Sequence, residues 1–373
     1  MQTSKFILVL CLYFIIPLGI GAENTTRKWM ERYNVTYLTI DEGLPYNSVE
    51  DIVKDSHGFL WIASSSEGIT RYDGHEYLSF NMGTKRAKLR SNFIHKMCED
   101  RFGRLWVASE VGIDIIHLKQ LVNTQIPDEN NRFASFCNLP VSHIWQSSTG
   151  NLWISSENKL FKITFQSDGS IEHIIQVCQL PKGKSVHTIC EVDDYLWINY
   201  MDGVSRIKES VLKEQEPTIV SSALYLPGVE INVIQKKEDE IWIGSVQGLF
   251  RYNINTERIK YYFHDAHNSN TLSQNLVTDI VVTDTHSLLV ATFKGLNVYN
   301  PLTDSFERIN LDSGGNTLNS DFINCMLSDG DIIWAGTAIG GLNKIGKRTL
   351  NLRNYFHSSD KAGSISRNPI NAI

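Results

Sequence analysis

Few residues of this 373-residue chain are spaced for chemistry. His264 and His267 stand three positions apart, which suits a metal ion, but the surrounding run HDAHNSNT is typical of a solvated turn. The phosphate-loop, zinc-protease, nucleophile-elbow and calcium-loop motifs do not occur. The carboxylates are spread through predicted turns, whereas glycoside hydrolysis needs a converging pair. We therefore expect no catalytic residue, no metal ion and no cofactor.

The residues better placed for binding are polar or aromatic and stand where short apolar strands begin. Sugar recognition needs such side chains on a concave surface. The pair formed by His143 and Trp145, in the string VSHIW, is the strongest candidate. Turn capping and strand packing are the alternative roles. The full set of predicted ligand-binding residues is Asn47, Asn92, His143, Trp145, His187 and Asn275.

The elements that carry these residues repeat along the chain. An apolar residue followed by tryptophan recurs in strings such as LWIAS, LWVAS and IWIGS, and a seventh copy, LLVAT, has lost its tryptophan, which we align with Val290. Successive copies are 45, 47, 44, 45, 48 and 44 residues apart, the period of propeller blades. The tryptophans are Trp61, Trp106, Trp153, Trp197, Trp242 and Trp334. We expect them to fill the core between sheets rather than to bind a ligand.

Each repeat predicts four short strands joined by tight turns. In the clearest copy the first strand is 49–54, the turn is 55–58, and a glycine at position 68 separates the second and third strands. One such sheet leaves apolar faces uncovered, and radial packing of seven sheets covers them. The sequence therefore predicts an all-β, seven-bladed β-propeller of four-stranded antiparallel blades, with the start of an eighth repeat at the C-terminus.

Three segments follow from the ends of the array. Residues 1–22 read as a signal peptide, with Lys5 before an apolar run that is too short to span a bilayer. Residues 23–357 would form the propeller, and residues 358–373 would begin an eighth repeat, because 354–373 resembles 261–280. A stop within a repeat favours the front piece of a longer protein, and an overlap at ring closure is the alternative.

Composition narrows the class of protein further. The chain is 42% hydrophobic and 20% charged, with a net charge of −6, which excludes a disordered tail and argues against nucleic-acid binding. We expect an exported, periplasmic protein. After the signal peptide five cysteines remain, without a paired spacing. Cys98 and Cys190 fall at one point of the repeat and are interpreted as small buried apolar residues.

The strings GLPYNSVEDIVKDSHGFLWIASSSEGITRYDG and SNFIHKMCEDRFGRLWVASEVGIDII resemble the two-component regulator propeller repeat, as does EIWIGSVQGLFRYN. The resemblance covers residues 35–373 and weakens in the third and fourth units, where the Asp-x-x-Gly turn becomes Ser-Ser-Thr-Gly at 147–150 and Glu-Val-Asp-Asp at 191–194. It implies the N-terminal periplasmic sensor region of a Bacteroidetes-type hybrid two-component protein. In that family two propellers precede an immunoglobulin-like domain, a membrane span, a histidine kinase and a response regulator.

The resemblance implies a function that the spacing alone does not show. Family members sense oligosaccharides from polysaccharide breakdown, so we expect a ligand-sensing propeller that controls a histidine kinase outside this chain. The expected partners are an oligosaccharide or other small ligand, the second propeller and kinase modules, and a second copy in a homodimer, with no nucleic acid. The alternative is a stand-alone exported propeller that binds glycan or protein, or a glycan-cleaving propeller enzyme.

Overall fold

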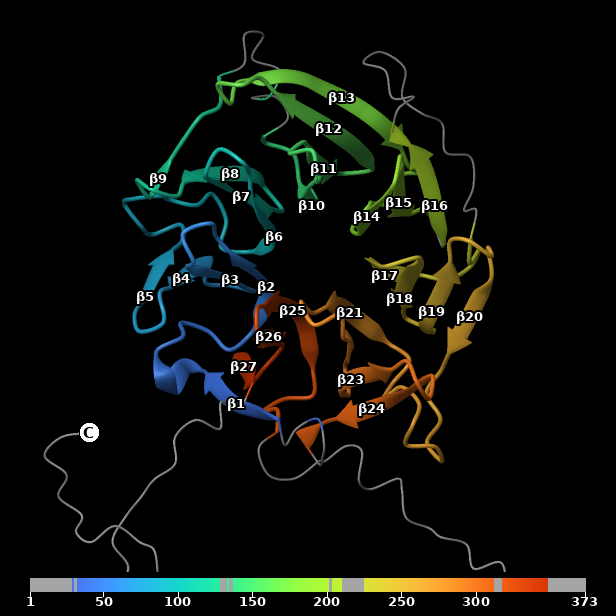
Figure 1. Cartoon of the computed structure of the whole chain (residues 1–373). Coiled ribbons are helices and arrows are strands. Elements are labelled where there is room, and N and C mark those ends of the chain that lie inside the picture. Colours follow the sequence, from blue (N-terminus) through green and yellow to red (C-terminus); the bar gives the residue numbers. More distant parts are fainter. Residues whose placement is uncertain are drawn as a thin grey trace, which may run out of the picture.

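Alternating strands and glycine turns build a ring of seven antiparallel sheets around a central axis (Figure 1). The computed structural model describes residues 29, 32–127, 133, 137–200, 203–209, 225–311 and 317–347. The predicted signal peptide, residues 1–22, and the predicted eighth repeat, residues 358–373, lie outside the described residues. Seven radially packed sheets confirm the predicted propeller. The domain boundaries stay predictions.

The first three blades each contain four strands in chain order, with the first strand innermost (Figure 1). Blade 1 consists of β2 (Val49–Lys54), β3 (Leu60–Ser64), β4 (Ile69–Tyr72) and β5 (Tyr77–Phe80). Blade 2 consists of β6 (Ile94–Glu99), β7 (Arg104–Ser109), β8 (Gly112–His117) and β9 (Val122–Asn123). Blade 3 consists of β10 (Val141–Gln146), β11 (Leu152–Ser156), β12 (Lys159–Phe165) and β13 (Ile171–Gln179).

The next three blades follow the same order. Blade 4 consists of β14 (Ile189–Val192), β15 (Tyr195–Asn199) and β16 (Val204–Lys208), and Tyr225 bridges Val204 at the place of a fourth strand. Blade 5 consists of β17 (Ile231–Lys237), β18 (Glu240–Ser245), β19 (Gly248–Asn253) and β20 (Ile259–Tyr262). Blade 6 consists of β21 (Val277–Val282), β22 (Leu288–Thr292), β23 (Gly295–Asn300) and β24 (Ser305–Ile309).

Blade 7 closes the ring with strands from both ends of the described chain. It consists of β25 (Ile323–Asp329), β26 (Ile332–Thr337), β27 (Leu342–Lys347) and the N-terminal strand β1 (Tyr33–Leu38), which is followed by the 3-10 turn η1 (Ile40–Glu42). β1 pairs with β27 in antiparallel register from Tyr33–Lys347 to Leu38–Leu342. The outer strand of the last blade therefore precedes the first blade in sequence.

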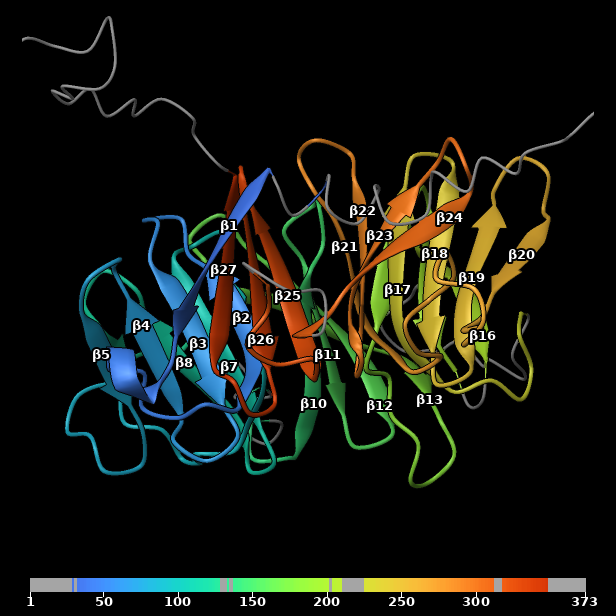
Figure 2. The ribbon, with the colours of Figure 1, turned by 90° about the horizontal axis from the view of Figure 1, so that it is seen from below.

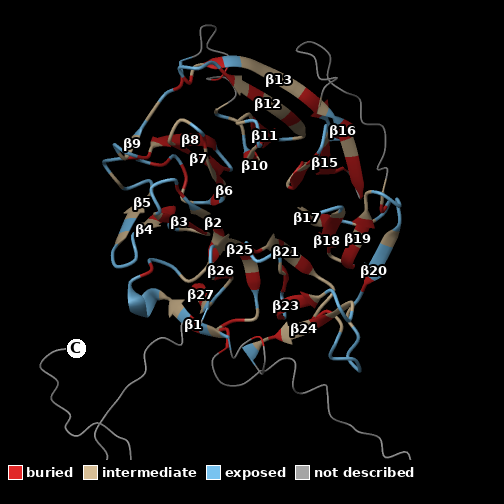
Figure 3. Ribbon diagram, viewed as in Figure 1, coloured by how far each residue is buried: buried red, intermediate tan, exposed pale blue. Residues whose placement is uncertain are grey.

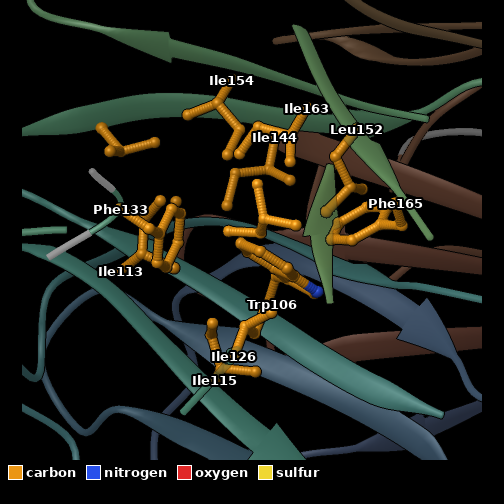
Figure 4. Close-up of a cluster of buried hydrophobic side chains, with 13 residues drawn as sticks. Trp106, Ile113, Ile115, Ile126, Phe133, Ile144, Leu152, Ile154, Ile163 and Phe165 are labelled. Carbon is orange, nitrogen blue, oxygen red and sulfur yellow. The ribbon is translucent and has the colours of Figure 1, made fainter. Parts of the chain in front are cut away.

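Each tryptophan anchor packs against the inner strands of the following blade. Trp106 of blade 2 shares a cluster with Ile144 and Ile154 of blade 3 (Figure 4). Trp334 of blade 7 does the same with Val49 of blade 1, which seals the ring. The buried residues accordingly lie between the blades, and exposed residues lie on the rims (Figure 3). The predicted core role of the tryptophans is confirmed.

The register corrects the position of the lost tryptophan. Leu289 pairs with Val281 as Trp61 pairs with Val53, so Leu289, and not Val290, occupies the anchor position of blade 6. Leu289 faces blade 7 and shares a cluster with Ile323. Leu288, Leu289 and Val290 are all apolar, so residue type alone does not distinguish the two alignments.

The turn between the first two strands supports the tryptophan that follows it. In blade 1 the indole Nε1 of Trp61 donates to Asp55 Oδ2 at 2.8 Å, and in blade 2 Trp106 Nε1 donates to Asp100 Oδ2 at 2.7 Å. Blade 3 has Ser147 at this place, and its Trp153 Nε1 is buried without a partner. The Asp-x-x-Gly turn and the tryptophan are thus one structural unit.

The cysteines are all free thiols within the described part of the chain. Cys190 is buried, and Cys98 is half-buried against the core between blades 2 and 3. Burial raises the pKa of Cys98 to about 12 and that of Cys190 to about 11. Such thiols stay protonated and unreactive at neutral pH, which fits the predicted packing role.

Candidate functional site

Viewed from the side, the ring has two rims, one at each end of the strands (Figure 2). We call one of them the entry rim. It is formed by the loops that lead into the innermost strands, such as 39–48, 81–93 and 263–276, and by the turns between second and third strands. The predicted binding residues lie in these loops or on the innermost strands. The structure therefore gathers them around the central axis.

The three predicted asparagines pin the loops of the entry rim. Asn47, Asn92 and Asn275 are each half-buried. Each side-chain oxygen accepts a bond from a main-chain N–H earlier in its loop: from Ile40 at 3.0 Å, Met82 at 2.9 Å and His264 at 2.6 Å. These contacts shape the rim, and ligand binding by the three residues stays a prediction.

His143 lies on β10 and His187 lies near it, in the loop that leads into β14, whereas Trp145 faces between the blades. His143 sits at an irregularity of β10, and its Nε2 is enclosed without a hydrogen-bond partner. Burial lowers the pKa of His143 to about 3, helped by the positive charge of Lys96 and by His187, so the ring is neutral. Trp145 packs against the cluster between blades 3 and 4. Ligand binding by all three residues stays a prediction.

A repeated hydrogen bond joins neighbouring blades at the entry rim. The donor is the side chain one position after the first residue of the innermost strand, and the acceptor is the main-chain carbonyl of that first residue in the next blade. We call this bond the inner latch. In blade 4 the equivalent residues, Val186 and His187, lie just before β14. The donor–acceptor pairs are Ser142–Val186 at 3.4 Å, His187–Ile231 at 2.6 Å, Asn232–Val277 at 2.8 Å, Thr278–Ile323 at 2.7 Å and Asn324–Val49 at 3.1 Å.

A second layer of bonds lies one residue deeper. Here a side-chain oxygen accepts from a main-chain N–H of the next blade. Asp51 accepts from Met97 at 2.8 Å, Thr188 from Ile234 at 2.9 Å and Asp279 from Met326 at 2.6 Å. Burial raises the pKa of Asp279 to about 6, although the positive charge of Lys96 and the hydrogen bond from Met326 N each act to lower it.

The inner latch is missing at two neighbouring interfaces. Glu50 and His95 stand at the donor position of blades 1 and 2, and neither bonds to the next blade. Between blades 1 and 2 the deeper layer compensates, because Asp51 binds Met97 N and the Nζ of Lys96 at 2.6 Å. Between blades 2 and 3 neither layer contains a bond among the described residues. We call this interface the open interface. Farther out on the rim, blade 2 contacts the loop that leads into blade 3, where Ile113 N donates to Cys137 O at 3.0 Å and Arg90 Nη1 donates to Asn138 Oδ1 at 2.8 Å.

A pocket of about 690 Å³ opens on the entry rim beside the open interface. His95 and Val141 belong to both, and His95 is exposed without a hydrogen bond to any described residue. The turns of blades 2 and 3 contribute Glu110 and Glu157, and the loop into blade 4 contributes Lys182 and Lys184. The lining therefore mixes acceptors and donors of both charges around an open mouth.

The sequence-based selection missed this lining. His95, Glu110 and Glu157 carry no motif, but aligning the inner strands puts His95 and Glu50 where other repeats have Ser142, His187, Asn232, Thr278 and Asn324. The differences at this aligned position are the sequence feature that could have indicated the pocket. In the described residues no group of histidines, cysteines and carboxylates is arranged to hold a metal ion. His264 Nδ1 instead contacts the carbonyl of Leu272 at 2.7 Å.

Comparisons with known proteins come from a family model and from solved structures. Residues 43–66 and 88–110 match the two component regulator propeller model. These segments run from the entry rim through the first two strands of blades 1 and 2, and they include Glu50, His95 and Glu110. A search of curated proteins found no match.

Two of the similar solved structures are extracellular domains assigned to B. thetaiotaomicron signalling systems. One, assigned to a hybrid two component system, has a TM-score of 0.65 and 22% identity over 90% of this chain and 44% of its own length. The other, assigned to a one component system, has a TM-score of 0.63 and 20% identity over 86% of this chain and 40% of its own length. This chain thus spans less than half of either domain.

A propeller enzyme is similar as well. The virginiamycin B lyase of Staphylococcus aureus has a TM-score of 0.59 and 16% identity, over 85% of this chain and 99% of that chain. At these identities the likeness shows the fold. No helix among the described residues is long and apolar enough to cross a membrane.

Proposed function

The chain carries repeats of the two component regulator propeller family, and from that premise we propose that it is the periplasmic ligand-sensing propeller of a hybrid two-component system. Its ligand is an oligosaccharide released from a polysaccharide, and the histidine kinase it controls lies outside this chain. The full receptor works as a homodimer in which ligand binding biases two states of the kinase. The signal peptide at residues 1–22 exports it.

The observation that carries this proposal is the pocket beside the open interface. It lies on loops at the rim of a rigid ring, where binding sites are commonly found. Its rim position leaves room for a ligand several rings long, and its lining offers carboxylates, ammonium groups and an amide from Asn158. Those groups suit a ligand covered with hydroxyls, which both donate and accept. Part of the family match, residues 88–110, falls on blade 2, which contributes His95 and Glu110 to the pocket.

Calorimetric titration of residues 23–373 with pooled plant-polysaccharide oligosaccharides tests the proposal. We expect saturable binding and no shortening of the oligosaccharides. The Glu157→Gln variant should weaken binding about tenfold, because a charged acceptor in the pocket is lost. Chain cleavage by the purified protein would contradict the sensor role and favour a glycan-cleaving enzyme.

The matched control is Asp193→Asn. Asp193 is also an exposed turn carboxylate with a left-handed backbone, φ 54° against 51° for Glu157, but it lines a pocket on the opposite rim. Both variants replace a carboxylate by an amide at comparable backbone geometry. Equal loss of affinity in the two variants would show that the effect is a general one of charge.

A further inference from the structure

The open interface leaves a main-chain acceptor without the donor that its counterparts have. At five interfaces the carbonyl at the start of the next inner strand, or just before it in blade 4, accepts a bond from a neighbouring side chain. The carbonyls of Ile94 and Val141 occupy the same place, yet no side chain among the described residues donates to them. A carbonyl oxygen has two lone pairs, so the place that no side chain fills is left to water or to a ligand.

The two vacant carbonyls differ in their surroundings. Val141 itself lines the rim pocket, together with His95 and Ser142, whereas Ile94 does not. The interface between blades 1 and 2 also has bonds in the deeper layer, where Asp51 accepts from Met97 N and forms an ion pair with Lys96. The vacancy at Val141 is therefore reachable from the pocket, and its interface has no other hydrogen bond in the two rim layers.

The charge of the lining narrows the class of ligand. Glu110 and Glu157 contribute two negative charges and Lys182 and Lys184 two positive charges, so they sum to zero. A strongly anionic or cationic ligand would meet as much repulsion as attraction there. The hydroxyl groups of a neutral molecule can donate to carboxylates and accept from ammonium groups.

We propose that a hydroxyl group of a neutral oligosaccharide donates to the Val141 carbonyl and thereby supplies the inner latch that the open interface lacks. This inference rests on the proposed sensor function and adds the contacting atom and the ligand's charge class. A ligand in the pocket that also contacts His95 then joins the inner strands of blades 2 and 3 at the entry rim. The bound state is more rigid at this interface than the free state.

A single substitution can imitate the bound state. Asparagine is the natural latch residue at Asn232 and Asn324, where its Nδ2 reaches the next carbonyl. His95→Asn puts the same group opposite Val141. Without any ligand we expect the melting temperature to rise by about 2 °C. Because the acceptor is then taken, binding of neutral oligosaccharides should weaken at least about tenfold.

The matched control is Glu50→Asn, which supplies the donor opposite Ile94, away from the pocket. It should raise the melting temperature similarly and leave binding unchanged. The probes are three pools added to residues 23–373 in thermal melts: neutral oligosaccharides from arabinan and xylan, acidic oligosaccharides from pectin and heparin, and tryptic peptides. Stabilisation by a neutral pool that is lost in His95→Asn and kept in Glu50→Asn supports the proposal.

The remaining outcomes separate two failures. If His95→Asn lowers the melting temperature, or if it binds the neutral pool as tightly as the unchanged protein, the latch is wrong and the sensor function stands. Stabilisation by acidic oligosaccharides or peptides alone overturns the neutral class. If no pool stabilises any of the three proteins, the proposed function itself fails, and the inference fails with it.

Discussion

The open interface between blades 2 and 3 and the interface between blades 6 and 7, which we call the latched interface, use the same repeat positions for different purposes. Between blades 6 and 7, Thr278 and Asp279 bind the next inner strand at 2.7 Å and 2.6 Å, so both rim layers are filled. At the open interface the same positions hold His95 and Lys96, and neither bonds across it. A pocket opens at this interface.

The anchors show the reverse pattern. The open interface contains Trp106, fully buried and bonded to Asp100, while the latched interface has only Leu289 at that position. Strong apolar packing therefore accompanies the missing polar bonds. The comparison teaches that the ring can leave one rim contact vacant for a ligand where the core beneath it is well packed.

The largest expected effect comes from removing the anchors. Trp106→Ala should cost about 3–5 kcal/mol of unfolding free energy, because it leaves a cavity and removes the indole bond to Asp100. Leu289→Ala should cost about 2–4 kcal/mol. Denaturant unfolding of both variants measures this difference. A greater loss for Leu289→Ala would break the claim that the open interface depends more on packing.

For substitutions at the rim, we expect the larger loss of stability at the interface between blades 6 and 7 and the smaller loss at the open interface. Thr278→Val keeps the shape but removes the latch donor, and it should cost about 1 kcal/mol. His95→Ala removes an exposed side chain without partners and should change the free energy of unfolding by less than about 0.5 kcal/mol. Denaturant titrations compare the two. Equal losses would show that His95 already has a structural partner.

A fall in pH should change the stabilising contributions of His143 and Asp279 in opposite directions. Folding lowers the pKa of His143 from 6.5 to about 3, so between these values the unfolded chain binds a proton that the folded chain does not. The contribution of His143 to the free energy of unfolding is therefore lost as the pH falls from 6.5 towards 3. Asp279, whose pKa rises from 3.8 to about 6, keeps a proton that the unfolded chain releases, so its contribution is lost as the pH rises from 3.8 to 6.

Two variants separate these contributions. Between pH 6.5 and pH 4.5, His143→Asn should lose less stability than the unchanged protein, and Asp279→Asn should lose more. Thermal melts across this range provide the measurement. If both variants differ from the unchanged protein in the same direction, the opposite pKa shifts of the two buried groups are contradicted.

The smallest expected effect is a gain at the far end of blade 3. Ser147→Asp gives Trp153 Nε1 the acceptor that Asp55 and Asp100 supply in blades 1 and 2. It should raise the free energy of unfolding by about 0.5–1 kcal/mol. A chemical denaturation curve detects this, and a loss of stability would mean that the turn of blade 3 has another geometry.

Much of the fold follows from the sequence because packing imposes a period on it. Trp61 and its counterparts must face the next sheet, and glycine must occupy turns such as 55–58, where Gly58 has φ 90°. The closure by β1 was not predicted, since pairing between Val35 and Ile345 depends on contacts far apart in the chain. A signal existed: YNVTYL precedes GLPYNSV as an outer strand precedes its rim loop elsewhere.

The candidate site was predicted only in its general location. Asn47, Asn92 and Asn275 do lie on the entry rim, but their oxygens bond to the main chain. The residues that line the pocket, such as Glu157 and Lys182, are ordinary surface types whose importance depends on a neighbouring blade. A sequence read one repeat at a time does not show a bond that is missing between two repeats.

Hydrogen exchange of residues 23–373, measured by mass spectrometry with and without the stabilising oligosaccharide pool, tests the central claim most directly. The account predicts added protection in 88–96, 139–142 and 179–186, which border the open interface and its pocket. The rim of the latched interface, residues 317–326, should exchange at the same rate in both states. Protection confined to residues 317–326, or to the opposite rim at 147–151, would contradict the account.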